Sequence, residues 1–353
     1  MLKIIKSNNY TIVIGNIALK KVNVFLQKNK YSSYYILCDE NTLQYCLPTL
    51  MLNCEPLKGA EIIEIESGES NKRIEIVTHC WRTLLENNVD KNTLLINLGG
   101  GVISDLGGFI AATYKRGIDF INIPTTLLAM ADASVGGKTG IDFAGIKNSI
   151  GTITQPKAVF VYPDFLKTLP QRHINNGLAE LHKIALINNK TFWNSLKTNT
   201  NVLQLIIKSV ELKNKIVIKD PFDKGIRKAL NFGHTVGHAI EALFLNTEQE
   251  LLHGEAIVLG MLIESHISFQ KKLISKTELN EIETVLNNTF TLAKKLELTT
   301  ISILELLKHD KKNTSTKLKF ALVSKIGSCK IDVQVTPIQI EKAIHYLKSK
   351  VDV

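Results

Sequence analysis

The sequence of 353 residues has only five cysteines, and their spacing excludes a disulfide framework and a thiolate zinc site. Their number is odd and no C-x-x-C pair occurs, so we expect reduced and mostly buried thiols at Cys38, Cys46, Cys54, Cys80 and Cys329. No stretch approaches the roughly 18 apolar residues of a membrane span, and the N-terminus lacks the apolar region of a signal peptide. These absences predict a cytoplasmic protein that makes no membrane contact.

Positive charge exceeds negative charge, but it is not gathered into basic blocks. The chain has 43 Lys and Arg against 33 Asp and Glu, a formal net charge of +10. No RRM-like, zinc-finger or helix-turn-helix signature stands out along the chain. We therefore expect no nucleic-acid partner and a preference for small anionic ligands.

The length and the composition predict two globular domains. At about 150 residues per domain the chain is long enough for two, and its 44% hydrophobic and 22% charged residues are typical of globular proteins. We place the domains at 1–170 and 171–353. Two domains imply a cleft, the usual place for a small-molecule site.

The two halves differ in hydrophobic period. In the first half, β-rich runs alternate with helical stretches, which predicts an α/β domain with a parallel, doubly wound sheet. In the second half, long apolar-periodic stretches predict an all-α domain with one hairpin around Lys317 to Val335. The expected strands are Tyr10–Val13, Tyr34–Cys38, Glu61–Ile65, Thr93–Leu98, Phe120–Ile123 and Val159–Val161.

A glycine-rich turn, Gly99–Gly101, follows the run Thr93–Leu98 and opens a helix. Glycines at a strand-to-helix turn let backbone N–H groups approach a pyrophosphate, although this turn is not the common G-x-G-x-x-G fingerprint. Asp39 with Asn41 and Ser67–Glu69 follow two other strands, so all three loops are expected at one edge of the sheet. We expect a dinucleotide here, and the alternative is a tight structural turn.

A second glycine-rich stretch, Asp132–Gly140, has only a superficial likeness to a P-loop, because Asp132 stands where that motif needs its first glycine. Lys138 in this backbone is nevertheless a suitable point charge for a phosphate ester. Lys147 and Asn148 follow shortly downstream. The alternative is an ordinary surface lysine.

Histidines and one glutamate predict a divalent metal site in the second half. His234 and His238 lie at i and i+4, so they share a helical face, and His253 opens the next helix. Glu180 is a further candidate ligand, whereas the Glu of the H-E-x-x-H motif is missing. A core role is more common for an isolated histidine, and spacing leaves open which three residues bind.

Ordered blocks of sequence resemble the 3-dehydroquinate synthase family, within the sugar-phosphate cyclase superfamily. The blocks run over nearly the whole chain and are specific only in combination: SGExxK, GGGVxxD, YKRG, PTTLLA, DASVGGKTGID, KNxIG, GLAE, RKxLNFGHTxGHAIE, LHGEA and HDKK. The resemblance implies a Rossmann-like NAD-binding domain followed by an α-helical metal- and substrate-binding domain.

The resemblance also implies a phosphate lyase of the shikimate pathway. It would convert 3-deoxy-D-arabino-heptulosonate 7-phosphate (DAHP) to 3-dehydroquinate and phosphate, with bound NAD and one zinc or cobalt ion. In that family NAD oxidises the substrate transiently, phosphate leaves by β-elimination, the ketone is reduced again, and the ring opens and recloses as an intramolecular aldol. The alternatives are another sugar-phosphate cyclase, a metal-dependent polyol dehydrogenase and a non-catalytic binding protein.

The resemblance assigns the metal ligands to Glu180, His234 and His253, and it places His238 near the substrate phosphate. Arg116 matches an arginine that reaches into the partner subunit's site, which implies a homodimer. Other groups match residues around the phosphate, the carboxylate and the ring: Lys138, Asn148, Lys183, Lys213, Arg227, Asn231 and one of Lys311 and Lys312.

The implied NAD contacts lie in the loops after the strands and in a later short stretch. They are Asp39, Asn41, Ser67, Gly68, Glu69, Ser70, Asn71, Lys72, Gly101, Val102, Ile103, Ser104, Asp105, Thr125, Thr126, Lys138, Lys147, Phe165, Leu166, Lys167 and Thr168.

Three residues depart from the family pattern. Ser104 replaces a frequent glycine, which is tolerable if the position does not need a positive φ. Asp223 replaces the usual glutamate, which lengthens an expected contact to Arg227. His182 stands at a usually aliphatic position, and because adjacent helical residues point about 100° apart, we expect it behind the ligands or on the surface.

Overall fold

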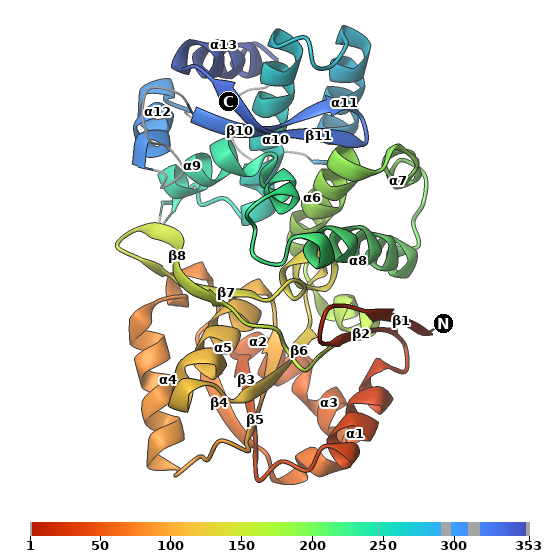
Figure 1. Ribbon diagram of the computed structural model, residues 1–353, viewed down its shortest axis with the longest axis vertical. Coiled ribbons are helices and arrows are strands. Elements are labelled where there is room, and N and C mark those ends of the chain that lie inside the picture. The colour runs from red at the N-terminus through yellow and green to blue at the C-terminus, as the bar shows by residue number, and fades with distance from the viewer. Residues whose placement is uncertain (1, 246, 291–297, 310–317, 351–353) are drawn as a thin grey trace. The chain divides into compact units, whose positions relative to one another are not determined.

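The computed structural model describes residues 2–245, 247–290, 298–309 and 318–350 (Figure 1). Contacts divide the chain into two compact units. The first unit comprises Met1–Ile174 with Val202–Asn214, and the second comprises Asn175–Asn201 with Lys215–Val353. The predicted boundary at residue 170 assigns the segment Val202–Asn214 to the second domain, whereas its contacts place it in the first unit.

The first unit contains a seven-stranded sheet in the order β1-β2-β9-β6-β5-β3-β4. All the expected strands are present, and neighbouring strands from β2 to β4 are parallel. The edge strand β1 instead pairs antiparallel with β2, so the sheet is not wholly parallel. The bounds are β1 (Leu2–Lys6), β2 (Thr11–Gly15), β3 (Tyr34–Asp39), β4 (Glu61–Ile65), β5 (Leu94–Gly99), β6 (Asp119–Pro124) and β9 (Ala158–Val161).

Helices cover both faces of this sheet, with α4 and α5 on one side and α1 and α3 on the other (Figure 1). All six residues of β5 are buried, as expected for a strand between two helical layers. The helices are α1 (Ala18–Lys28), α2 (Glu40–Tyr45), α3 (Leu47–Asn53), α4 (Ile74–Glu86) and α5 (Gly101–Thr113), with short turns η1 (Glu55–Gly59), η2 (Glu69–Asn71), η3 (Tyr114–Arg116), the π-helical η4 (Ala129–Ala133) and η5 (Pro163–Thr168).

A separate hairpin of β7 (Lys138–Phe143) and β8 (Ile146–Ile153) was not predicted. It begins at Lys138, within the second glycine-rich stretch. Gly140 and Gly151 face each other, and a Cβ on Gly140 would lie 2.6 Å from the carbonyl oxygen of Ile150. Glycine therefore permits this close pairing, although its low strand propensity concealed the strands in the sequence.

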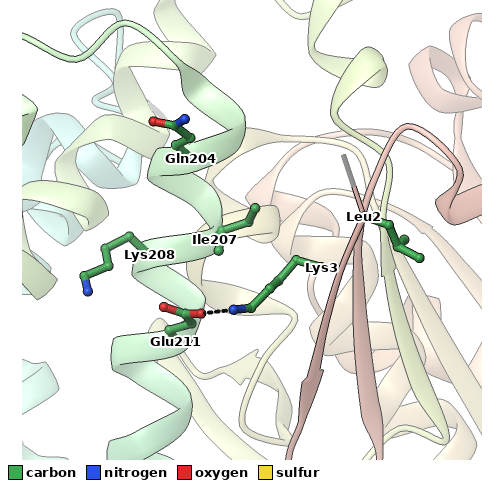
Figure 2. Close-up of a pocket in the computed structure, with 6 residues that line it drawn as sticks. All are labelled: Leu2, Lys3, Gln204, Ile207, Lys208 and Glu211. Carbon is green, nitrogen blue, oxygen red and sulfur yellow. Dashed lines mark ion pairs between the residues drawn. The ribbon is translucent and has the colours of Figure 1, made fainter.

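The first part of helix α8 (Val202–Lys219) packs beside β1, where a shallow pocket is lined by both elements (Figure 2). Lys3 Nζ lies 2.6 Å from Glu211 Oε1, and Asn214 Nδ2 donates to the carbonyl oxygen of Lys6 at 2.8 Å. These contacts explain why the segment belongs to the first unit.

Where it is described, the second unit is helical apart from the hairpin of β10 (Leu318–Lys325) and β11 (Ser328–Val335), which confirms the prediction around residues 317–335. Among the described residues, no helix combines the length and the apolarity needed to cross a membrane. The helices are α6 (Gln171–Asn188), α7 (Lys190–Leu196), α9 (His234–Phe244), α10 (His253–Gln270), α11 (Lys276–Thr289), α12 (Thr300–His309) and α13 (Pro337–Lys348), with the short turn η6 (Ile226–Asn231).

All five cysteines are free thiols, four of them buried and Cys329 intermediate. Burial raises the pKa of each of these thiols to about 12. The prediction of reduced, mostly buried cysteines is confirmed, and such thiols are poor nucleophiles at neutral pH.

Candidate active site

Three loops of the first unit meet at one sheet edge because β3, β4 and β5 are parallel neighbours. Asp39 ends β3 and caps helix α2 by accepting a hydrogen bond from the backbone N–H of Thr42 at 2.8 Å. Glu40 accepts from the backbone N–H of Ser67 at 2.9 Å and so joins the first two loops. The expectation that these loops share an edge is confirmed.

The glycine turn after β5 leads directly into α5, with Gly100 as the N-cap residue and no side-chain cap. A Cβ on Gly99 would lie 2.4 Å from the Ile103 side chain, so this position needs glycine for close packing. Uncapped N–H groups at a glycine-lined helix N-terminus are suited to a phosphate group.

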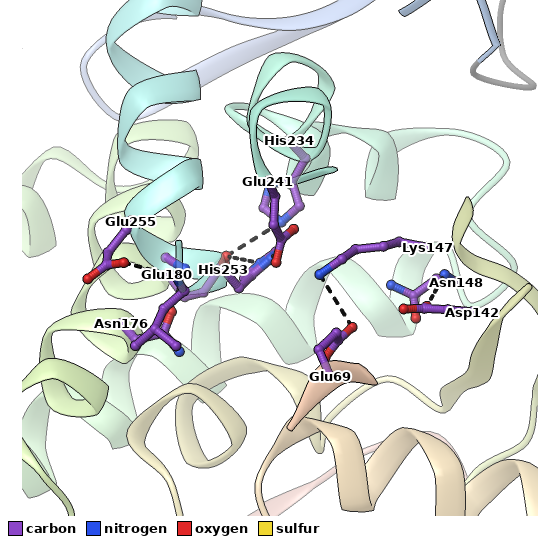
Figure 3. Close-up of polar contacts among 12 residues, drawn as sticks. Glu69, Asp142, Lys147, Asn148, Asn176, Glu180, His234, Glu241, His253 and Glu255 are labelled. Carbon is purple, nitrogen blue, oxygen red and sulfur yellow. Dashed lines mark hydrogen bonds and ion pairs between the residues drawn. The ribbon is translucent and has the colours of Figure 1, made fainter. Parts of the chain in front are cut away.

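Lys72 is the centre of a polar cluster beside this turn. It is 3% exposed, and its Nζ lies 2.7 Å from Asp105 Oδ2 and donates to Asn148 Oδ1 at 2.6 Å. Lys147 Nζ lies 3.6 Å from Glu69 Oε1 (Figure 3). The structure therefore brings together residues from the SGExxK, GGGVxxD and KNxIG blocks.

Electrostatics hold Lys72 in its charged form. Burial alone would lower the pKa of Lys72, but the carboxylates of Asp105 and Glu69 raise it above its usual range. Burial raises the pKa of Asp105, and Lys72 opposes that shift. Removal of either Lys72 or Asp105 would therefore leave an uncompensated buried charge.

Lys213 contacts the π-helical turn η4 within the first unit. Its Nζ lies 2.9 Å from Asp132 Oδ1 and donates to the Asp132 carbonyl oxygen at 2.7 Å. Ser209, one turn earlier on α8, donates to the carbonyl oxygen of Ala131 at 3.1 Å. Lys138 follows the turn and is exposed at the start of β7. Asp132 is a partner of Lys213 that spacing in the sequence did not reveal.

The metal candidates of the second unit converge from three helices. Glu180 lies on α6, His234 and His238 on α9, and His253 at the start of α10. One ligand atom from each of the three histidines lies within 4.8 Å of the others. Glu180 Oε1 is 3.4 Å from the Nε2 atoms of both His234 and His253 (Figure 3).

The ring nitrogens that face away from Glu180 meet hydrogen-bond acceptors. His234 Nδ1 is 3.2 Å from the carbonyl oxygen of Phe232, and His253 Nδ1 is 3.3 Å from Glu241 Oε2. A proton held at Nδ1 leaves a lone pair on Nε2, as in most metal-binding histidines. One carboxylate and two or three such imidazoles suit zinc or cobalt, so the donor set fits the expected divalent metal.

Glu180 is 1% exposed and pairs with the equally buried Lys183. Burial would raise the pKa of Glu180, but Lys183 and His253 lower it to about 2. Burial, with Lys183 nearby, holds the pKa of His234 well below its usual range. Burial opposes the protonation of His253, but Glu241 and Glu180 raise its pKa to about 10. The site therefore contains an ionised carboxylate and a neutral His234, whereas His253 binds a metal only after it loses the Nε2 proton that these carboxylates stabilise.

Asn176 was not singled out in the sequence, although it joins the two helices that carry Glu180 and His253. Its side-chain oxygen accepts from the backbone N–H of Gly254. A Cβ on Gly254 would lie 2.2 Å from the Asn176 carbonyl oxygen, so only glycine allows this approach. The only available signal was that Asn176 precedes Glu180 by one helical turn.

The three departures from the family pattern have separate outcomes. Ser104 is helical and buried, its hydroxyl donates to the Gly100 carbonyl oxygen at 3.1 Å, and its φ is not positive, so the serine fits. His182 is 2% exposed and packs edge-on against Trp193 and Phe290, so of its two expected positions, behind the ligands or on the surface, the surface is excluded. Burial lowers the pKa of His182 to about 4.

The third departure lies in the loop before η6. Arg227 Nη1 donates to the carbonyl oxygen of Pro221 at 2.8 Å, and the Arg227 backbone N–H donates to Asp220 Oδ2 at 3.0 Å. Asp223 has a φ of 57° in this loop. Arg227 is buried and Asn231 is partly exposed, whereas Lys311 and Lys312 lie outside the described residues.

The other expected cofactor residues occupy the ends of strands and short turns. Thr125 is buried after β6, and the Thr126 hydroxyl accepts from the backbone N–H of Ala129 at 3.2 Å. In η5 the ring of Phe165 is buried, while Lys167 is exposed and pairs with Asp164 at 2.9 Å.

Comparison with known proteins gives the family. The family model described as 3-dehydroquinate synthase N-terminal matches residues 62–176, and its C-terminal counterpart matches residues 177–313. A 3-dehydroquinate synthase from Parabacteroides distasonis is 37% identical over 345 residues, which cover 96% of this chain and 97% of the relative.

Two solved structures have the same fold. A 2-deoxy-scyllo-inosose synthase complexed with carbaglucose-6-phosphate, NAD+ and Co2+ matches with a TM-score of 0.86 at 22% identity, covering 98% of this chain and 100% of the other. A 2-epi-5-epi-valiolone synthase from Streptomyces hygroscopicus with NAD+ and Zn2+ bound matches with a TM-score of 0.84 at 25% identity, covering 99% and 100%. The predicted fold class is confirmed. Given both family models and the full-length relative, the chain belongs to the 3-dehydroquinate synthase family.

Proposed function

We propose that this chain converts DAHP to 3-dehydroquinate and phosphate, with NAD and one zinc or cobalt ion as cofactors. The observation that carries the proposal is the convergence of Glu180 with three histidines in a chain of this family. Identity of 37% to a named 3-dehydroquinate synthase, against 22% and 25% to the two other cyclases, favours this substrate.

We assign the metal to Glu180, His234 and His253, and we give His238 a role beside the substrate phosphate. Glu241 supports the assignment because it holds Nδ1 of His253 and leaves Nε2 directed toward Glu180. A set of three histidines is the alternative, since His238 offers a ligand atom in the same cluster. The bound metal would act as a Lewis acid that lowers the pKa of coordinated substrate hydroxyls.

The cofactor site is proposed at the loops after β3, β4 and β5. Backbone N–H groups at Gly101–Ser104 would bind the pyrophosphate, and Asp39 would bind the ribose. Bound NAD would accept a hydride from the substrate and return it later, so the net reaction is redox neutral. Lys72 forms a direct ion pair with Asp105 beside this turn.

Asn148 and Lys138 are proposed phosphate ligands of the first unit, and Lys183 is one of the second. Lys72 supports the role of Asn148, because its ammonium occupies the amide oxygen and leaves the NH₂ group to donate to an anion. Lys213 and Arg227 are proposed to recognise the substrate carboxylate and ring, together with Asn231. One of Lys311 and Lys312 is proposed to complete the phosphate group's contacts.

Phosphate release tests the proposal. The purified chain is incubated with DAHP, zinc or cobalt and substoichiometric NAD, and phosphate and 3-dehydroquinate are measured together. We expect many turnovers for each NAD and no accumulation of free NADH. A polyol dehydrogenase would accumulate NADH, whereas another cyclase would turn over a sugar phosphate without the carboxylate and leave DAHP unchanged.

We further propose that Arg116 acts in the partner subunit of a homodimer. Arg116 is exposed, and it lies at the end of α5 in a turn where Lys115, Arg116 and Gly117 all have positive φ. A positive φ at the two non-glycine residues, Lys115 and Arg116, costs backbone strain, which is often found at functional sites. An isologous two-fold dimer would give each site one arginine from its neighbour.

Hybrid dimers test the role of Arg116. The inactive variants Arg116→Ala and His253→Ala are unfolded together and refolded. Random pairing makes half the dimers hybrids with one working site of two, so about a quarter of wild-type activity should return. No recovery, with hybrids verified by mass, would show that Arg116 acts in its own subunit or not at all.

We also propose a cytoplasmic location, because five free thiols suit a reducing compartment. Cell fractionation with an antibody to the chain tests this. Recovery in a secreted fraction would contradict it.

A further inference from the structure

Glu264 is a fully buried carboxylate in the middle of α10, with 0% exposure. The preceding residues Met261, Leu262 and Ile263 are buried and apolar. A carboxylate in such surroundings is tolerated only where hydrogen bonds replace its water. The partners of Glu264 therefore indicate why the charge is there.

Both oxygens of Glu264 accept hydrogen bonds from the start of helix α9. Oε2 accepts from the backbone N–H of Gly233 at 2.6 Å, and Oε1 accepts from that of Val236 at 3.1 Å. Gly233 is the N-cap residue of α9 and has no side chain to cap the helix. The two N–H groups belong to the N-cap and N3 positions, which a capping box would satisfy. Glu264 thus caps α9 from the neighbouring helix, where its charge also meets the positive end of the helix dipole.

This cap reaches His234 through one peptide group. The N–H of Gly233 shares a peptide plane with the carbonyl of Phe232, whose oxygen lies 3.2 Å from His234 Nδ1. Because a trans peptide is planar, its N–H and C=O point in opposite directions and rotate together. A carboxylate that fixes the N–H therefore also fixes the carbonyl that orients the imidazole.

The packing of α9 on α10 restricts the backbone that directly follows this peptide. A Cβ on Gly260 would lie 1.9 Å from the Gly233 carbonyl oxygen, and one on Gly237 would lie 2.8 Å from Ile257 Cδ1. The backbones therefore approach closely on the same stretch that Glu264 caps. The close contact fixes the position of the start of α9, and Glu264 fixes the orientation of the Phe232–Gly233 peptide group.

We propose that Glu264 is a positioning residue of the metal site, which sets the tautomer and the ring orientation of His234 through the Phe232–Gly233 peptide. The inference rests on the proposed function in that it takes His234 as a metal ligand. It goes beyond that function because Glu264 is outside the proposed ligand set and acts through backbone N–H groups. Its effect is to present Nε2 of His234, unprotonated, toward Glu180.

The substitution Glu264→Gln tests the proposal on the full chain. Glutamine has nearly the same shape, but its amide nitrogen would face one of the two N–H donors, so one hydrogen bond is lost. We expect the dissociation constant for zinc, measured by competition with a chelator, to rise about 10- to 100-fold. The visible absorption of the cobalt-loaded protein should change as well, because the ligand geometry changes.

The matched control is Glu278→Gln. Glu278 also caps a helix of the second unit, since its Oε2 accepts from the backbone N–H of Ser275 at 3.0 Å, but it caps α11, which carries no metal candidate. We expect unchanged zinc affinity in this variant. Equal weakening in both variants would show a general loss of stability and overturn the proposal.

A second measurement does not need the metal. In metal-free protein labelled with ¹⁵N-histidine, His234 should carry its proton on Nδ1, and Glu264→Gln should give a mixture of tautomers. If Glu264→Gln does not fold, Glu264→Asp supports the same comparison with a shorter reach. An unchanged tautomer with unchanged zinc affinity overturns the inference. Failure of the wild type to form 3-dehydroquinate would instead refute the proposed function, and the tautomer comparison would still decide the role of Glu264.

Discussion

The two units bring their candidate residues together by different physical means. In the first unit, hydrogen bonding between the parallel neighbours β3, β4 and β5 places three loops at one edge. In the second unit, Glu180, His234 and His253 come from three helices, and no ladder of hydrogen bonds fixes one helix against another. Glycines at close approach and the side chains of Asn176 and Glu264 do so instead.

This difference shows where each site is most sensitive to substitution. We expect the sheet to tolerate changes in its loops as long as the strands pair, because backbone hydrogen bonds between the strands hold the loop ends together. Helix packing depends on surface shape, so one methyl group at a glycine contact moves a whole helix and every ligand it carries. Four predictions test this contrast, in order of expected effect.

The largest effect is expected from removing His253, the proposed metal ligand that α10 provides. His253→Ala should lose the metal and retain less than about one-thousandth of the wild-type activity, because several kcal/mol of transition-state stabilisation are lost. His238→Ala, which changes a neighbouring ring of the same cluster, should keep the metal and lose turnover. Elemental analysis of both purified variants measures this. Metal loss in His238→Ala would favour the set of three histidines.

The next effect concerns the buried ion pair of the sheet unit. Lys72→Met leaves Asp105 without its cation, so the free energy of unfolding should fall by about 3–5 kcal/mol. Lys58→Met, which removes an exposed pair with Glu55, should change it by at most about 1 kcal/mol. Urea unfolding gives both values. Similar losses in the two variants would show that the Lys72 cluster does not stabilise the unit.

A smaller effect is expected from one methyl group at the α9–α10 contact. Gly260→Ala should lower the free energy of unfolding by about 1–3 kcal/mol and weaken zinc binding, because its Cβ would meet the Gly233 carbonyl. Gly59→Ala, with nothing within 4 Å of its Cβ, should stay within about 1 kcal/mol of the wild type. A Gly260→Ala protein with unchanged zinc affinity would contradict the dependence of the site on helix packing.

The smallest effect is a pH dependence in the helical unit. The ring of His266 stacks on Tyr346, and burial, with Lys276 nearby, lowers its pKa to about 4. The unfolded chain therefore binds this proton first, and stability should be lost as the pH falls from about 6.5 to about 4. His266→Phe should reduce that loss, whereas His79→Gln on the exposed face of α4 should not. Urea midpoints at several pH values measure the difference, and identical profiles for His266→Phe and the wild type would rule it out.

The main architecture could be predicted because its signals are local. Short β-rich runs of three to six residues between helical stretches indicated β2 to β6 and β9, and the glycine turn at Gly99–Gly101 marked the start of α5. The hairpin β7–β8 escaped because Gly140 and Gly151, which allow its strands to approach, have low strand propensity. The pairing of Gly140 with Gly151 can be recognised only once the two strands are placed side by side.

By itself the sequence determined the fold class and the residues able to hold a phosphate or a metal, because charge, ring nitrogens and periodicity are properties of single residues and short segments. Only the tertiary structure decided that Lys72 pairs with both Asp105 and Asn148, that His182 is buried among aromatic rings, and that Glu264 caps the helix of His234. Most of those partners lie more than 30 residues apart along the chain, and whether they meet depends on how the helices and strands pack, which no local pattern encodes.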